Sequence, residues 1–103
     1  MGIALPYANT PHNVPVSQTA HVISGQAGGA GAVGDYMHEI LVRVATAATS
    51  QVTLIDGATQ MIIVPANTPI GVYSLVFDTA SQNSNWAVTT AAGVSCICYG
   101  TFS

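Results

Sequence analysis

From residue 35 onward, apolar and polar side chains alternate in short segments, which is the pattern of β-strands. Six segments fit it: Tyr36–Thr46, Gln51–Ile55, Gln60–Val64, Val72–Asp78, Asn85–Thr90 and Val94–Phe102. Turn residues separate them, including the hairpin dipeptide Asp56-Gly57. No segment has the apolar repeat and the caps of a helix. The spacing predicts one all-β domain, an antiparallel β-sandwich or jelly-roll-like body over residues 35–103.

Several of these strands carry large side chains on both faces. In the first strand, one row of alternate residues is His38, Ile40, Val42 and Val44, and the other is Met37, Glu39, Leu41, Arg43 and Ala45. The segments Met61–Val64 and Cys96–Tyr99 also place bulky groups on both sides. No helix is predicted that could cover a second face. We therefore expect these faces to meet another layer of the same domain or a neighbouring subunit, in preference to forming a large exposed patch.

The core is expected to come from the larger residues that share one side of a strand. These residues are Tyr73, Leu75 and Phe77, then Trp86 and Val88, and finally Val52 and Leu54. Cys96 and Cys98 lie two residues apart on one strand face, close to the long limit for a disulfide. We expect both to be free, buried thiols that pack in the core.

Residues 1–34 read differently from the rest. Three prolines, Pro6, Pro11 and Pro15, predict an extended N-terminal arm rather than a central strand, since proline cannot donate to a β-ladder. Val16–Ser24 could form one edge strand. The glycine-rich segment 25–34 is either a flexible connector, which we favour, or a tight passage beside a neighbour.

Charge is scarce for a chain of 103 residues. Half of the residues are hydrophobic, whereas only five are charged: Arg43, Asp35, Glu39, Asp56 and Asp78. Ordinary soluble domains carry roughly 25% charged residues, and charge depletion marks interface cores. This composition favours a protein whose surface is occupied by neighbours, although a stable neutral monomer is the alternative.

The same composition excludes several classes of partner. With a single basic residue the chain has no electrostatic footprint for nucleic acid and no polybasic attraction to membranes. No apolar run approaches the roughly 20 residues needed to span a bilayer. The first residues lack the basic leader and apolar core of a signal peptide.

No set of residues predicts catalysis or a cofactor. The histidines His12, His21 and His38 are scattered, and strand alternation puts His38 and Glu39 on opposite faces, so no metal site is expected. No serine lies in a nucleophile elbow, and no spacing selects a carboxylate pair as in a hydrolase. We interpret Arg43 as an ion-pair partner of Asp56 or Asp78 rather than a catalytic group. The chain is therefore expected not to be an enzyme.

A family resemblance lies in the body. The succession GDYMHEILVRV, VTLIDGA, IIVPANTPIGVYSLVF, NWAVTTAAGV and YGTF, over residues 34–103, resembles capsid decoration (cement) proteins of tailed bacteriophages. The resemblance implies a sandwich or jelly roll, commonly a homotrimer, made in the bacterial cytoplasm. It also implies a seat on the outer virion surface, where capsomers of the major capsid protein meet. The N-terminal third matches less and would be a gripping arm.

Candidate interface residues come from the arm, from one two-sided strand and from the single cation. They are Pro6, Tyr7, Pro11, Val14, Met61, Ile63 and Arg43. The alternative function is a phage tail, fibre or spike module that binds a host-surface glycan through Trp86, Tyr73 or Tyr36. Core packing is the preferred role of Trp86 and Tyr73.

Overall fold

The computed structural model describes residues 10–25, 29–47 and 50–103, and it shows an all-β protein. Its eight strands are β1 (Thr10–Val14), β2 (His21–Val22), β3 (Tyr36–Val44), β4 (Val52–Asp56), β5 (Thr59–Val64), β6 (Gly71–Ala80), β7 (Trp86–Thr89) and β8 (Val94–Thr101). The described residues form no helix, and hence none that is long and apolar enough to cross a membrane.

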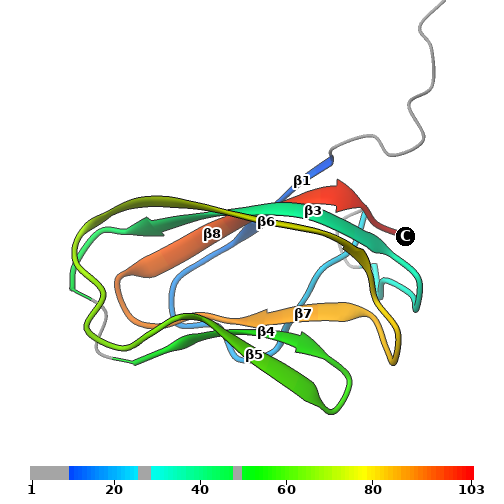
Figure 1. Cartoon of the computed structure of the whole chain (residues 1–103), viewed down its shortest axis with the longest axis horizontal. Helices are drawn as coiled ribbons and strands as arrows, with labels where there is room; N and C mark the ends of the chain where they lie inside the picture. The colour runs from blue at the N-terminus through cyan, green and yellow to red at the C-terminus, as the bar shows by residue number, and fades with distance from the viewer. Residues whose placement is uncertain (1–9, 26–28, 48–49) are drawn as a thin grey trace, which may run out of the picture.

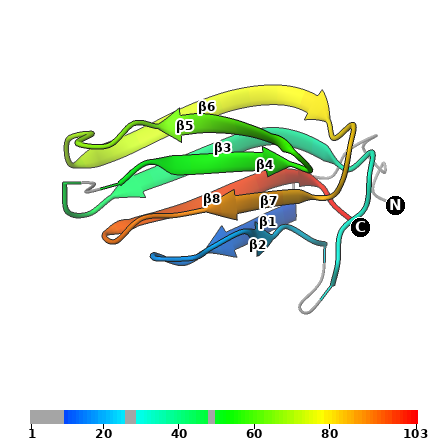
Figure 2. The ribbon, with the colours of Figure 1, turned by 90° about the horizontal axis from the view of Figure 1, so that it is seen from below.

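The strands form two antiparallel four-stranded sheets packed face to face (Figure 1). The sheet order is β1-β8-β3-β6 in one layer and β2-β7-β4-β5 in the other. The first strand thus pairs with the eighth, the second with the seventh, the third with the sixth and the fourth with the fifth. This nested pairing of eight strands in two sheets is the jelly-roll form of the β-sandwich. Strands β1 and β2 lie at one edge of the two layers, and β5 and β6 lie at the other (Figure 2).

All six strands predicted after residue 35 are present, with ends that differ by one or two residues. The prediction of a strand over Val16–Ser24 was wrong for most of its length, because only His21–Val22 pairs. Ser17 and Ala20 both have positive φ, which turns the chain between β1 and β2. Their side chains gave no signal of this turn, since neither is glycine, asparagine or aspartate.

The sandwich begins earlier in the chain than residue 35. Strand β1 completes one sheet and β2 completes the other, so residues from Thr10 onward belong to the body. Pro11 is accommodated because β1 is an edge strand, which pairs on one side only. Residues 1–9, the rest of the predicted arm, lie outside the described part of the chain.

Part of the glycine-rich segment is a tight passage. A Cβ on Gly25 would lie 2.2 Å from the backbone oxygen of Phe102, and one on Gly31 would lie 2.6 Å from that of Ile23. Gly31 also has a φ of 67°, which favours glycine. For Gly25 and Gly31, the favoured reading of a flexible connector was therefore wrong. Residues 26–28 lie outside the described range.

The core lies between the two sheets and matches the predicted faces. Trp86, Leu54 and Val88 of one sheet meet Ile40 and Val42 of the other, and all five are at most 2% exposed. Tyr73, Leu75 and Phe77 pack against this core as predicted. The indole Nε1 of Trp86 donates a 2.8 Å hydrogen bond to the backbone oxygen of Asp35, so the one polar atom of the ring is satisfied. Cys96 and Cys98 are free and buried, which confirms their prediction.

Candidate functional site

Alternate residues of β1, β8, β3 and β6 point away from the core and form one continuous surface, here called the outer face. The strand register aligns them in three rows that run across the sheet. These rows are Pro11, Tyr99, Glu39 and Val76; then Asn13, Ile97, Leu41 and Ser74; then Ser95, Arg43 and Val72. The three rows hold aliphatic, aromatic and neutral polar side chains with one cation and one carboxylate. Such a surface is much less charged than the usual exterior of a soluble domain.

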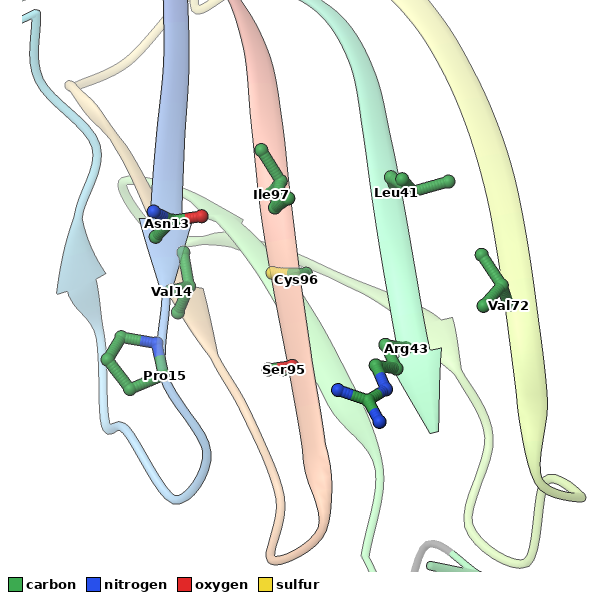
Figure 3. A pocket seen from close by; sticks show the side chains of 9 residues that line it. All are labelled: Asn13, Val14, Pro15, Leu41, Arg43, Val72, Ser95, Cys96 and Ile97. Carbon is green, nitrogen blue, oxygen red and sulfur yellow. The ribbon is translucent and has the colours of Figure 1, made fainter. Parts of the chain in front are cut away.

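The outer face is hollowed near the end where β1 and β3 end and β8 begins. A depression of about 410 Å³ is lined by side chains from all four strands, including Asn13, Leu41, Arg43, Val72 and Ile97 (Figure 3). The guanidinium of Arg43 extends from β3 towards Ser95 on β8, its partner in register (Figure 3). Val72 is 65% exposed although it lies in a strand. The depression is therefore shallow and mainly apolar, with Arg43 as its one charged group.

A second hollow lies at the edge of the sandwich that β5 and β6 form. It also measures about 410 Å³ and lies between β5 and β6, lined by Met61, Ile62, Leu75, Val76 and Phe77, among others. Ile62 and Val76 are 58% and 63% exposed. Large exposed aliphatic residues thus continue from the outer face onto the free edge of the sandwich, here called the β5–β6 edge.

A polar cluster occupies the far end of the outer face, and a β-bulge creates it. The register of β3 shifts between Met37 and Glu39 against both neighbouring strands, so that Met37 and Ile40 both face the core. His38 and Glu39 then both point outward, the first bonding to Asp78 and the second to Ser74. The prediction that His38 and Glu39 lie on opposite faces was wrong, since strict alternation fails at a bulge.

Asp78 is the centre of this cluster. His38 Nδ1 donates to its Oδ1 at 2.5 Å, and the hydroxyl of Tyr36 donates to the same oxygen at 2.9 Å. These two hydrogen bonds, that from His38 first, lower the pKa of Asp78 below the ordinary 3.8. Asp78 itself is exposed, so the cluster contributes local order to the surface rather than much stability.

The predicted ion pair of Arg43 was wrong. Among the described residues the one ion pair joins His38 to Asp78. Asp56, the other candidate, lies on the opposite sheet, where its carboxylate accepts backbone N–H groups of Gln82, Asn83 and Ser84 at 2.9–3.0 Å. Arg43 is therefore exposed on the outer face, without a carboxylate partner in the part of the chain that the structure describes.

The remaining interface candidates are dispersed. Pro11 is exposed on the edge strand β1, whereas Val14 is 1% exposed and belongs to the core, so it offers no accessible surface to a partner. Met61 lies on the β5–β6 edge, and Ile63 is partly buried against the core. Pro6 and Tyr7 lie outside the described residues. Leu41, Val72 and Ile97, which line the depression, were not selected from the sequence, although the two-sided patterns of their strands were the signal.

The aromatic residues considered for glycan binding are engaged elsewhere. Trp86 is 2% exposed and part of the core. The hydroxyl of Tyr73 donates to the backbone oxygen of Pro69 at 2.8 Å, and its ring packs against the core. Tyr36 is half-buried and donates to Asp78. No two of the three make a shared platform.

The described residues contain no group of three or more histidine, cysteine, aspartate or glutamate side chains arranged to hold a metal ion. Comparison with protein-family models, with curated proteins and with solved structures finds no match to this chain.

Proposed function

We propose that this chain is a structural virion protein, a decoration protein that binds the outside of a phage head and bridges its capsomers. The observation that supports this role most is the outer face, where exposed aliphatic residues such as Val72 and Val76 lie among rows that hold only one cation and one carboxylate. Surfaces depleted of charge and rich in aliphatic and aromatic groups are typical of interface cores. The major capsid protein is the proposed partner, and the role requires no catalytic residue.

Stabilisation of the shell would come mainly from burial of apolar area. Burial of apolar surface contributes about 25 cal/mol per Å², so a contact of roughly 1,000 Å² gives a net binding free energy only after the entropic cost of association is subtracted. Several copies bound around one capsomer junction would add their net binding free energies. The proposed homotrimer places such copies together, with the β5–β6 edge as its contact surface.

The N-terminal residues extend this proposal. Residues 1–9 are joined to β1, which is an edge strand. A segment in that position can add as an extended strand to the free edge of a neighbour, where main-chain hydrogen bonds give affinity. Pro6 and Tyr7 are the residues of this arm that we propose contact the neighbour.

The jelly-roll fold alone does not choose between a decoration protein and a glycan-binding fibre module, since both viral capsid proteins and lectins use it. The burial of Trp86 favours the decoration protein, because it removes the strongest stacking residue from the surface.

The proposal is tested on phage shells assembled without this chain. Addition of saturating chain is expected to raise the melting temperature of the shells, measured by calorimetry. The increase should differ little between 0.1 and about 1 M salt, because few charges take part. Shells that melt at the same temperature with and without bound chain would contradict the proposal.

Lysine substitutions locate the binding surface. Val72→Lys and Val76→Lys each place a charge on the outer face and are expected to weaken shell binding by at least tenfold, since a buried unpaired charge is costly. Val33→Lys is the matched control, because Val33 is 60% exposed but lies in the loop before β3, outside the three rows of the outer face. Equal binding by all three variants and the unmodified chain would show that the outer face is not the seat.

A further inference from the structure

Two histidines that are nine residues apart in the sequence meet across the two sheets. His12 on β1 is aligned with Cys98 and His21 on β2 with Val88, both of which are fully buried core residues. Both rings therefore lean into the space between the sheets, at the edge formed by β1 and β2. Their Nε2 atoms are 3.0 Å apart, and the ring centroids are 5.2 Å apart at an angle of 62°.

The other nitrogen of each ring faces an oxygen. His12 Nδ1 lies 2.9 Å from the backbone oxygen of Ser24, and His21 Nδ1 lies 3.1 Å from Oε1 of Gln18. The backbone N–H of Ser24 also donates a longer hydrogen bond to His12 Nδ1, at 3.4 Å, when that nitrogen carries no hydrogen. The Nδ1–H tautomer of each ring matches the shorter contacts to the two oxygens.

In that tautomer the two Nε2 lone pairs point at each other. At 3.0 Å the two nitrogens are joined by a hydrogen shared between them, as in an N–H···N hydrogen bond, or by a metal ion. Histidines that bind metal ions almost always donate their other N–H to a carboxylate or a backbone carbonyl, which orients the ring and raises its basicity. The oxygens of Ser24 and Gln18 already supply that support.

We propose that His12 and His21 form a two-histidine site for a divalent transition-metal ion, Cu²⁺ or Zn²⁺. Bonds of 2.0–2.1 Å at a tetrahedral angle require nitrogens roughly 3.3 Å apart, a few tenths of an ångström more than in this structure. Water completes the coordination, since the described residues offer no third histidine, cysteine or carboxylate in position. With two imidazole ligands, Cu²⁺ is expected to bind more tightly than Zn²⁺.

Such a site would join the two sheets at the edge formed by β1 and β2, where strand pairing is sparse. Strand β2 pairs through only two residues, and β1 pairs with β8 alone. A metal ion held by one ring from each strand is a cross-link between the layers, so its binding free energy adds to the free energy of unfolding. This site is independent of the proposed virion role.

The test is thermal unfolding of the full chain, without a histidine tag and after chelator treatment. Cu²⁺ and Zn²⁺ are expected to raise the melting temperature at pH 7.5, Cu²⁺ at the lower concentration, whereas Mg²⁺ should have no effect. His12→Asn and His21→Asn should each abolish the shift. His38→Asn is the matched control and should keep it, because His38 lies on the outer face with Asp78.

Substitution of Gln18 gives a second test, because the affinity for Zn²⁺ would not change if Gln18 had only a structural role. Gln18→Glu should tighten Zn²⁺ binding several-fold, and Gln18→Ala should weaken it, since loss of such supporting groups costs roughly 10–100-fold in affinity. In the unmodified chain, long-range ¹H–¹⁵N imidazole spectra should show metal shifts at both Nε2 atoms, with both Nδ1 atoms protonated. Melting and spectra unchanged by either metal, or a shift that survives in His12→Asn, would overturn the proposal in favour of a shared proton only.

Discussion

Asp56 illustrates how a single side chain fixes a loop of this sandwich. Burial raises the pKa of its carboxyl group, but the backbone N–H groups of Gln82, Asn83 and Ser84 outweigh that effect and hold the pKa below the ordinary 3.8. The sequence marked Asp56 as half of a hairpin dipeptide and as a candidate partner of Arg43, but not as a partner of the backbone N–H groups that lie 26–28 residues away. The folded chain uses it to close the turn between β6 and β7.

Asp56→Asn is expected to lower the free energy of unfolding by about 2 kcal/mol at pH 7, since hydrogen bonds to a charged group are lost. Because the folded-state pKa is depressed, this contribution is complete above pH 4 and is lost as the pH falls through the folded-state value. Urea unfolding at pH 7 and pH 2.5 measures both effects, and the variant should show the smaller pH dependence. Asp78→Asn, at the exposed carboxylate, should change stability much less; an equal loss in both variants would contradict this account.

Among the strands, the bulge in β3 has the largest consequence for the surface. It turns His38 and Glu39 to the same side and brings the backbone oxygen of Tyr36 against β8. Gly100 lies at this point, and a Cβ there would be 2.0 Å from that oxygen. A glycine inside a strand is typical of such close backbone approach. The glycine was visible in the sequence, but the bulge opposite it was not.

Gly100→Ala is expected to destabilise the protein by about 1–3 kcal/mol, because the backbone of β3 must move to admit a methyl group. For a domain of this size each kcal/mol lowers the melting temperature by roughly 4–8 °C. Gly71→Ala is the control, since a Cβ there meets only the Tyr73 ring at 3.3 Å or more. Circular dichroism melts should separate the two variants, and a Gly100→Ala protein as stable as its control would refute the close approach.

For the whole molecule, the described surface is mainly neutral, and four of its eight exposed large hydrophobic residues lie on the outer face and the β5–β6 edge, namely Met61, Ile62, Val72 and Val76. The composition showed that charged residues are few, but it did not show where the exposed aliphatic residues lie on the surface. Strand order decided the distribution, because β5 and β6 are free edges and β3 and β8 are central. Free edges with exposed aliphatic residues favour association with other chains.

The purified chain is therefore expected to self-associate, with a mass in sedimentation equilibrium that rises with concentration towards that of a trimer. Ile62→Lys, on the β5–β6 edge, should shift the protein to monomers, whereas Val33→Lys should not. A chain that stays monomeric at millimolar concentration would remove self-association from the proposed function and leave only the contact with the shell.

Local pattern by itself determined the all-β class, six of the eight strands, the core faces of β6 and β7 and the burial of both cysteines. These features depend on alternation and side-chain size, which are properties of neighbouring residues. Only the tertiary structure decided the short strand β2, the bulge at His38, the partners of Asp56 and the meeting of His12 with His21. Each of these depends on which strands become neighbours, and the nested pairing of first with eighth and second with seventh joins residues that no local pattern connects.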